Sequence, residues 1–476
     1  TYHFDVEASA LATALDIFVS IFIAPLFTSS CAAREVKAVD SENSKNLTSN
    51  SRRLYQLIKS TAKADYAFAH FGTGNLETLA TAPDAAGIDV RAALLDFHAK
   101  YYSANLMRMC LVSPLPLDDM AAMLHDAHVP LIANHNAPLP VFDSAAASRV
   151  SADSCLTDRL AAASPLPFAD PPSGPHWYTM VPVSEERSMV FLFALPGLRH
   201  AYSTKPLALI THILGHEGSG SLLSALRAPG WATELSAYTY LEHWEFTVLA
   251  VKVMLTPAGL DSTDAIAAAV FHMLRLVAAA PDAVLAALYA EHAAMAEINF
   301  TFREKSSPRS TAKSLAVALH TYAPEHILVG PYLHSPAGLN VGLLRNVVLP
   351  CLVPELARVY VVAHATASSA SLTERWYGTK YGRVELSSEQ RALFNGTDSL
   401  PALCSTLALP ELNPYIPDSF DILPGCDGVR PGSDDPLAPP VPLKLIDDAT
   451  GRVFYIRDTV YAQPKVLGSV TLYSHE

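Results

Sequence analysis

The sequence lacks the short motifs that mark several large enzyme classes. It contains no Walker loop, no GxGxxG and no GxSxG, so nucleotide binding and α/β-hydrolase chemistry have no support. Positive charge is also scarce, because 33 Lys and Arg stand against 46 Asp and Glu, a net charge of −13. A general nucleic-acid binder carries the opposite sign. The charge therefore favours neutral or basic partners, and no nucleic-acid partner is expected.

Cysteine is sparse and scattered, with no CxxC pair and no zinc-ribbon or iron–sulfur spacing. This pattern predicts buried thiols in a reducing compartment, and no disulfide framework. The six residues are Cys31, Cys110, Cys155, Cys351, Cys404 and Cys426.

Long hydrophobic runs are few. The longest, residues 11–27, contains Asp16 and Pro25, whereas a membrane span needs ~20 apolar residues, so a buried helix is expected. No targeting segment is visible, since the chain starts at Thr1 within a strand-like run. It also stops after a strand-like run, and both ends are expected to be cuts through a larger protein.

Apolar residues, in contrast, make up 50% of the chain, enough for a large core and about three domains at ~150 residues each. A strand-like run, a polar turn and an Ala-rich helix follow one another at residues 4–23, 106–124 and 248–274. This recurrence indicates duplicated α/β domains.

Proline marks the boundaries between these units. Pro-rich stretches, which fit neither helices nor central strands, occupy residues 129–150, 164–175 and 410–442. The last of them reads as a linker. Strand-like runs then open another domain at residues 443–446, 453–457 and 466–473.

An expected helix over residues 30–46 carries two carboxylates of interest. Glu35 and Glu42 are seven residues apart, two turns along one face, and they lie nearer the apolar side. Because an unpaired buried carboxylate is costly, each needs a partner. One interpretation is a metal ligand with a supporting carboxylate. The other is a pair of salt bridges to basic groups elsewhere.

A second candidate for chemistry is the run THILGHEG at residues 211–218. His212 and His216 have the i, i+4 spacing that zinc peptidases use on a helix, but no Glu stands between them. Gly215 weakens a helix at this point by ~1 kcal/mol. The alternatives are an unrelated hydrolase with zinc on the two His residues, and a helix end with buried His before a new helix at 221–226.

Resemblance to a known family enters at residues 34–42, REVKAVDSE. With this segment the chain strongly resembles the insulysin-like pitrilysin family of zinc peptidases, which carry an inverted HxxEH motif. The resemblance continues in order across almost the whole chain. Its further segments are 71–75, 87–91, 101–106, 215–218, 376–379 and 420–423.

The resemblance implies a zinc site that this chain completes only in part. Glu42 matches the distal carboxylate ligand, and Glu35 matches the carboxylate that orients a ligating His. Two His ligands and the general-base Glu belong to HxxEH, which lies upstream of the matched region in the family and occurs nowhere in these 476 residues. The chain is therefore expected to be a fragment, inactive alone, whose zinc would activate a water molecule in the full-length protein.

The resemblance also implies two places that hold a peptide. Relatives have an exosite that binds a substrate's N-terminus by strand addition. The matching positions in this chain are Gly215, Glu217 and the edge formed by Leu235, Ser236 and Ala237. This chain lacks the family's Gly-rich stretch there, and Tyr238 is expected to narrow the groove.

Three further positions line the cleft in the family: Ser51, Arg52 and Tyr55. Arg52 replaces the usual bulky aromatic residue, which predicts a bias toward acidic or polar peptide side chains.

Together these inferences predict an α+β fold of tandem duplicated pitrilysin-type domains, each a mixed β-sheet with helices packed on one face. The expected domains are 1–142, the C-terminal part of catalytic domain 1; 143–411, domain 2 with the exosite; 412–437, a linker; and 438–476, the start of domain 3.

The expected function is that of a zinc metalloendopeptidase acting on peptides and small unfolded proteins. The alternative is a non-catalytic peptide-binding member of the same superfamily. Expected partners are peptide substrates, the missing C-terminal half of the same protein and a second copy in a homodimer. No membrane span is expected, and the location is expected to be cytoplasmic.

Overall fold

The computed structural model describes residues 1–137, 166–168, 176–421, 443–448, 451–455 and 469–471. The chain divides into two compact units. The first comprises Thr1–Glu297 with Lys305–Leu412, and the second comprises Ile298–Glu304 with Asn413–Glu476. In the second unit, β8 (Leu443–Asp448) and β9 (Gly451–Tyr455) form an antiparallel pair.

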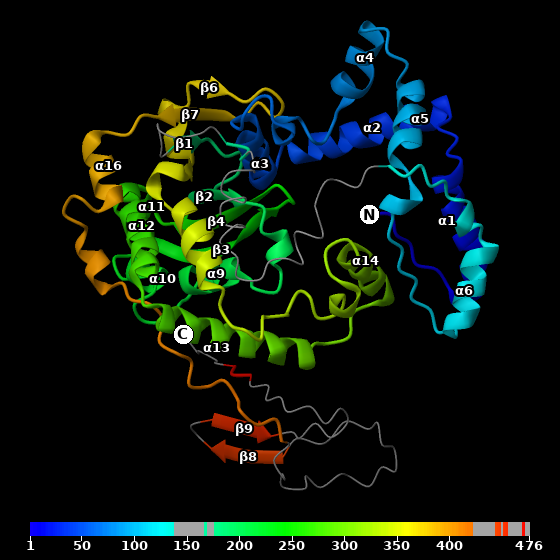
Figure 1. Ribbon diagram of the computed structural model, residues 1–476. Helices are drawn as coiled ribbons and strands as arrows, with labels where there is room; N and C mark the ends of the chain where they lie inside the picture. The colour runs from blue at the N-terminus through cyan, green and yellow to red at the C-terminus, as the bar shows by residue number, and fades with distance from the viewer. Residues whose placement is uncertain (138–165, 169–175, 422–442, 449–450, 456–468, 472–476) are drawn as a thin grey trace. The chain divides into compact units, whose positions relative to one another are not determined.

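A seven-stranded mixed sheet organises the first unit, in the order β3-β4-β2-β5-β1-β7-β6 (Figure 1). Only β1 and β5 are parallel; the other neighbours are antiparallel. The strands are β1 (His176–Met180), β2 (Ser188–Pro196), β3 (Ala232–Glu242), β4 (Phe246–Leu255), β5 (Ala357–Val362), β6 (Leu372–Thr373) and β7 (Lys380–Val384).

Helices precede and interrupt the strands. The N-terminal helices are α1 (Leu11–Ile23), α2 (Ser29–Asn46), α3 (Asn50–Ser60), α4 (Ala82–Ala85), α5 (Val90–Tyr101) and α6 (Leu117–Asp126). Those that follow β2 are α9 (Pro206–Leu214), α10 (Leu222–Arg227), α11 (Pro257–Leu260), α12 (Thr263–Ala279), α13 (Asp282–Thr301), α14 (Pro308–Ala318), α15 (Val341–Leu343) and α16 (Ser388–Asn395).

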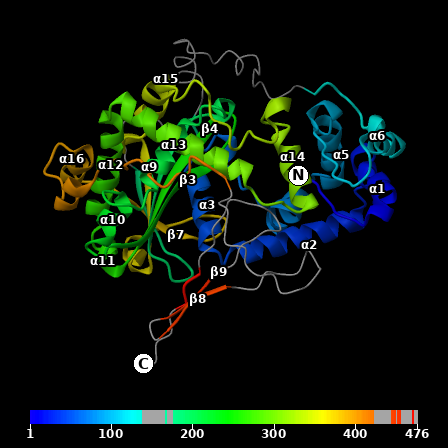
Figure 2. The same ribbon diagram turned by 90° about the horizontal axis from the view of Figure 1, so that it is seen from below.

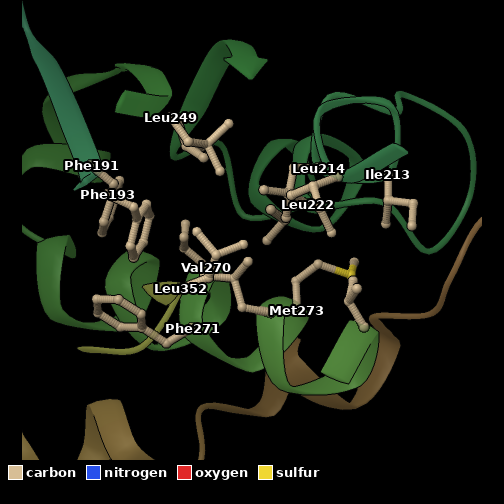
Figure 3. Packing of buried hydrophobic residues seen from close by; sticks show 14 of the residues in the cluster. Phe191, Phe193, Ile213, Leu214, Leu222, Leu249, Val270, Phe271, Met273 and Leu352 are labelled. Atoms are coloured by element: carbon tan, nitrogen blue, oxygen red, sulfur yellow. The ribbon is translucent and has the colours of Figure 1, made fainter. Parts of the chain in front are cut away.

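Strand β2 shows why the sheet is covered on both faces. Its residues are all buried, and because successive side chains point to opposite faces, they divide between two cores. Phe191 and Phe193 join the core under α9, α10 and α12 (Figure 3). Leu192 and its alternating neighbours join a second core beneath α3. Figure 2 shows the same arrangement from below, with α9 next to β3.

The predicted α+β fold is confirmed, and so is the third strand–turn–helix unit, since residues 248–274 form the end of β4, α11 and most of α12. The expected strands in the first two units are wrong, because residues 2–6 and 106–112 form no strand although α1 and α6 follow them. Within the described part of residues 1–137 no strand is available to pair with them, and an extended segment keeps a ladder only with a partner.

Other expectations can be compared directly with the structure. Helix α1 ends at Ile23, before Pro25, whose ring disfavours helix at the preceding residue. Among the described residues no single helix is long and apolar enough to cross a membrane. The bent pair α12 and α13, with an angle of 104° between the two helices, reaches the length and composition of a span when the two are taken together.

The predicted burial of the cysteine thiols is wrong at Cys31, which is exposed. Cys155 and Cys426 lie outside the described residues.

The C-terminal strand-like runs at 443–446 and 453–457 correspond to β8 and β9. Most of the run at 466–473 and of the Pro-rich stretches lies outside the described residues. The domain boundaries stay predictions.

Candidate functional site

Helix α2 carries the two carboxylates to which the sequence assigns a zinc site. The Thr28 side chain caps it by accepting the backbone N–H of Cys31 at 3.4 Å, and the buried residue of the helix is Asn43. Glu35 and Glu42 both lie exposed to solvent. The inward orientation expected for them is therefore not found, and their assigned roles stay predictions.

The possible zinc ligands in the described part of the chain do not form a complete site. Within the described ranges, no three or more His, Cys, Asp or Glu side chains come together as a group that could hold a metal ion. A catalytic zinc needs three protein ligands, and Glu42 alone supplies one. The described residues thus do not make a zinc centre by themselves.

Helix α3 is better fixed, because buried polar contacts tie it to the distant loop between β6 and β7. Ser49 caps the helix by accepting from the N–H of Arg52 at 3.5 Å. The guanidinium of the buried Arg53 donates to the carbonyls of Leu47 at 3.0 Å and Tyr377 at 2.7 Å. Arg53 therefore joins α3 to a segment more than 300 residues away.

Glu374, only 2% exposed, completes this anchor. Its carboxylate accepts from the backbone N–H groups of Trp376 at 3.0 Å and Tyr377 at 2.7 Å, and from the Ser60 hydroxyl at 2.9 Å. Hydrogen bonds to a buried charge are the stronger kind. They hold the C-terminal end of α3 in a fixed position on the sheet.

The other side of α3 carries the predicted cleft residues. Ser51 and Arg52 are exposed, and the hydroxyl of Ser51 lies 3.0 Å from that of Ser49. The half-buried Tyr55 makes an edge-to-face contact with Tyr240 of β3, with ring centroids 6.2 Å apart. Burial raises the pKa of Tyr55, and the charge of Arg52 acts in the opposite direction. Of the predicted cleft residues, Tyr55 is the one that the structure brings into contact with strand β3.

Strand β3 is an edge of the sheet, since β4 is its one neighbour in the described chain. Leu235 is buried, Ala237 half-buried and Ser236 exposed, and the register with β4 shifts at two places. An edge strand presents a row of backbone N–H and C=O groups to whatever lies beside it. Tyr238, 37% exposed, stands next to Tyr240 with centroids 6.2 Å apart.

Gly215 explains how α9 approaches this edge. It caps the end of α9, and a Cβ there would lie 3.7 Å from the nitrogen of Ala237 and only 2.9 Å from the carbonyl oxygen of Thr211. A Cβ at this position would therefore press on the carbonyl of Thr211 in α9, while its distance to Ala237 would be an ordinary contact. The structure therefore brings Gly215 and Ala237 together, while Glu217 is exposed and 3.9 Å from Arg227. Their assignment to an exosite stays a prediction.

The His212 and His216 pair does not share a helix, because α9 ends at Leu214. This corrects the i, i+4 geometry read from the sequence. His212 Nε2 lies 3.5 Å from Glu291 Oε1, and its ring packs against His292. The helix expected at 221–226 is found as α10, with Ser221 as its cap.

Sequence reasoning missed several residues that the fold brings to this region. These residues include Tyr240, Glu374 and Lys59, whose ammonium lies 5.6 Å from the ring centroid of Tyr55, and none of them belongs to a short motif. Lys59 follows Tyr55 by one helical turn, and that spacing was the one signal available.

Comparison with family models matches three consecutive parts of the chain. Residues 1–65 match a model described as "Insulinase (Peptidase family M16)". Residues 89–287 match "Peptidase M16 inactive domain", and residues 300–476 match "Middle or third domain of peptidase_M16".

Sequence similarity to curated proteins indicates the same family. The chain is 32% identical to the insulin-degrading enzyme of Homo sapiens over 465 residues, which is 98% of this chain and 42% of that protein. It is 29% identical to the A-factor-processing enzyme of Saccharomyces cerevisiae, over 98% of this chain and 41% of that enzyme. A Schizosaccharomyces pombe relative named as a zinc protease is 32% identical, over 88% of this chain and 40% of its own length.

The chain thus spans about two fifths of the length of these relatives. Among solved structures, that of pitrilysin superposes with a TM-score of 0.77 at 24% identity, over 96% of this chain and 44% of that one. This likeness supports the fold.

Proposed function

The chain belongs to the insulinase, or M16, family of peptidases, and from this premise we propose that it holds peptides for hydrolysis as part of a zinc metalloendopeptidase. Its substrates would be peptides and small unfolded proteins. The expected partners are these substrates, a C-terminal half that completes the enzyme and a second copy in a homodimer.

The observation that carries the proposal is the edge of β3. Gly215 brings the end of α9 against Ala237, and the Tyr55–Tyr240 contact ties α3 to the same strand. An extended peptide laid along β3 would gain main-chain hydrogen bonds with little demand on its sequence. The exposed Tyr238 and Ser236 would then meet its side chains.

At the zinc site, the proposed roles of Glu42 and Glu35 are those that the resemblance implies. Glu42 would be one carboxylate ligand of the zinc ion, and Glu35 would support a ligating His. The HxxEH residues needed for the remaining ligands and the general base are absent from these 476 residues, and we propose that further chain supplies them. Zinc, when bound, would supply an activated water molecule.

Backbone methylation of a bound peptide tests strand addition. A fluorescent decapeptide is synthesised with a single N-methyl group at each position in turn. Methyl groups that fall on amides facing β3 should abolish binding, while those on alternate positions should be tolerated, because side-chain direction and hydrogen bonding alternate along a strand. If fluorescence-anisotropy titrations showed equal binding of all the methylated peptides, the result would contradict the proposal.

Hydrolysis of a quenched fluorogenic peptide by the full-length protein tests the catalytic part. Glu42→Gln should remove most turnover and lower the bound zinc, whereas the exposed control Glu411→Gln should change neither. A wild-type protein that binds the peptide without cleaving it would support the alternative, a non-catalytic peptide-binding member of the superfamily. That alternative is kept because residues 89–287 match the family's inactive domain.

A further inference from the structure

Helix α3 carries a stripe of two cations around a tyrosine. Arg52, Tyr55 and Lys59 occupy positions i, i+3 and i+7, so they lie on one side of the helix over two turns. In the described part of the chain neither cation has a hydrogen-bonded or ion-paired side-chain partner. Two unpaired positive groups on one face stand out in a chain with a net charge of −13.

Lys59 is the unusual member, because the residue is only 9% exposed. Its Nζ lies 5.6 Å from the ring centroid of Tyr55 and 5.1 Å from that of Phe68. Gly72 closes a third side, where a Cβ would meet Nζ at 3.2 Å. Burial lowers the pKa of Lys59.

Among the described residues, no carboxylate forms an ion pair with Lys59. Phe68 packs against His243 and Phe246, and Glu245, the carboxylate beside His243, accepts from the Tyr66 hydroxyl at 2.7 Å. Two aromatic faces stabilise a cation through the negative face of each ring. That offsets part of the cost of removing an ammonium from water, and an anion would offset more.

Arg52 extends the stripe into solvent. Its charge acts on both Tyr55 and Tyr240, the pair that joins α3 to β3. Tyr55 contacts both Tyr240 of β3 and the ammonium of Lys59, so the two cations lie on the side of α3 that meets β3. Because the whole chain repels anions, an acidic peptide needs local positive groups of this kind.

We propose that Lys59, with Arg52, forms a carboxylate-binding subsite beside strand β3, which makes peptides with an acidic group the preferred ligands. The inference rests on the proposed peptide binding at β3. The carboxylate is that of a Glu or Asp side chain or of the peptide C-terminus.

Matched peptides test the subsite. Four versions of one peptide carry Glu or Gln at one position and a C-terminal acid or amide. Their dissociation constants are measured for the full-length protein at low salt. We expect the wild type to prefer the carboxylate version of one pair by about tenfold, the effect of ~1.4 kcal/mol, and the pair that shows it identifies the source.

Variants separate recognition from support of the fold. Lys59→Met should reduce the preference to within about twofold while leaving the affinity for the neutral peptide unchanged, and Lys59→Arg should restore it. Lys45→Met, an exposed Lys on α2, serves as the control and should keep the full preference.

The outcomes are distinguishable. Equal binding of charged and neutral peptides by the wild type would overturn the subsite while leaving strand addition standing. Equal loss of both peptides in Lys59→Met would show a structural cation and also overturn it. Failure of every peptide to bind the wild type would overturn the proposed function itself.

Discussion

Replacement of Glu374 by Ala tests whether the anchor of α3 works as described. The side chain accepts three hydrogen bonds, two of them from the backbone N–H groups of Trp376 and Tyr377, and it is nearly inaccessible to water. Leaving a buried donor without an acceptor costs about 1–3 kcal/mol. With two such donors, we expect a loss of about 3 kcal/mol, which corresponds to roughly a hundredfold.

Amide hydrogen exchange followed by mass spectrometry measures this loss locally. The variant should exchange roughly a hundredfold faster in the segment around Tyr377 and in the C-terminal turn of α3, because both lose the same partner. Glu374→Gln should show a smaller effect, since it keeps an acceptor oxygen. The exposed Glu355→Ala is the control. Exchange within threefold of wild type in the Ala variant would refute the anchoring role.

Three further predictions concern the frame of the site. In Gly197→Ala the new Cβ would lie 1.7 Å from the carbonyl oxygen of Trp244, so the melting temperature should fall by several degrees, and an unchanged value would contradict this packing. Phe271→Ala removes a ring that is 1% exposed and should cost about 3–5 kcal/mol in urea unfolding; a loss under 1 kcal/mol would argue against a tight core. Burial lowers the pKa of His292 to about 4, with the charges of His334, His212 and Lys205 acting the same way. The folded state therefore takes up fewer protons than the unfolded state between pH about 6.5 and about 4, so stability should decline as the pH falls through that window. His292→Gln should flatten the decline in melting temperature, and an equally steep decline would place its origin elsewhere.

The sequence predicted several helices and strands whose formation depends on nearby residues, such as capping residues and periodic apolar residues. The helix expected at residues 221–226 is found as α10, with Ser221 as its cap. The strand-like run and Ala-rich helix at 248–274 likewise became β4 and α12. These elements need only a periodic sequence and a partner nearby in the chain.

The parts of the candidate site that the sequence could not predict depend on contacts between residues far apart in the chain. Ser60 and Glu374 are 314 residues apart, so no spacing rule joins them. Apart from Tyr55, the neighbours of the Lys59 ammonium come from outside its own helix, from η2 (Ala67–Ala69) and Gly72. The predicted orientation of Glu35 and Glu42 was wrong for a related reason. Their spacing shows that they share a face of α2, but the packing of the helix decides whether that face points inward or toward solvent.

Hydrogen exchange on strand β3 tests the central claim most directly. Exchange of the amides of Ala232–Glu242 is measured with and without a saturating peptide. We expect the amides that face away from β4 to gain protection, with those already paired to β4 unchanged, because an added strand can bond only on the open edge. Peptide bound at saturation with no new protection anywhere along β3 would contradict the account.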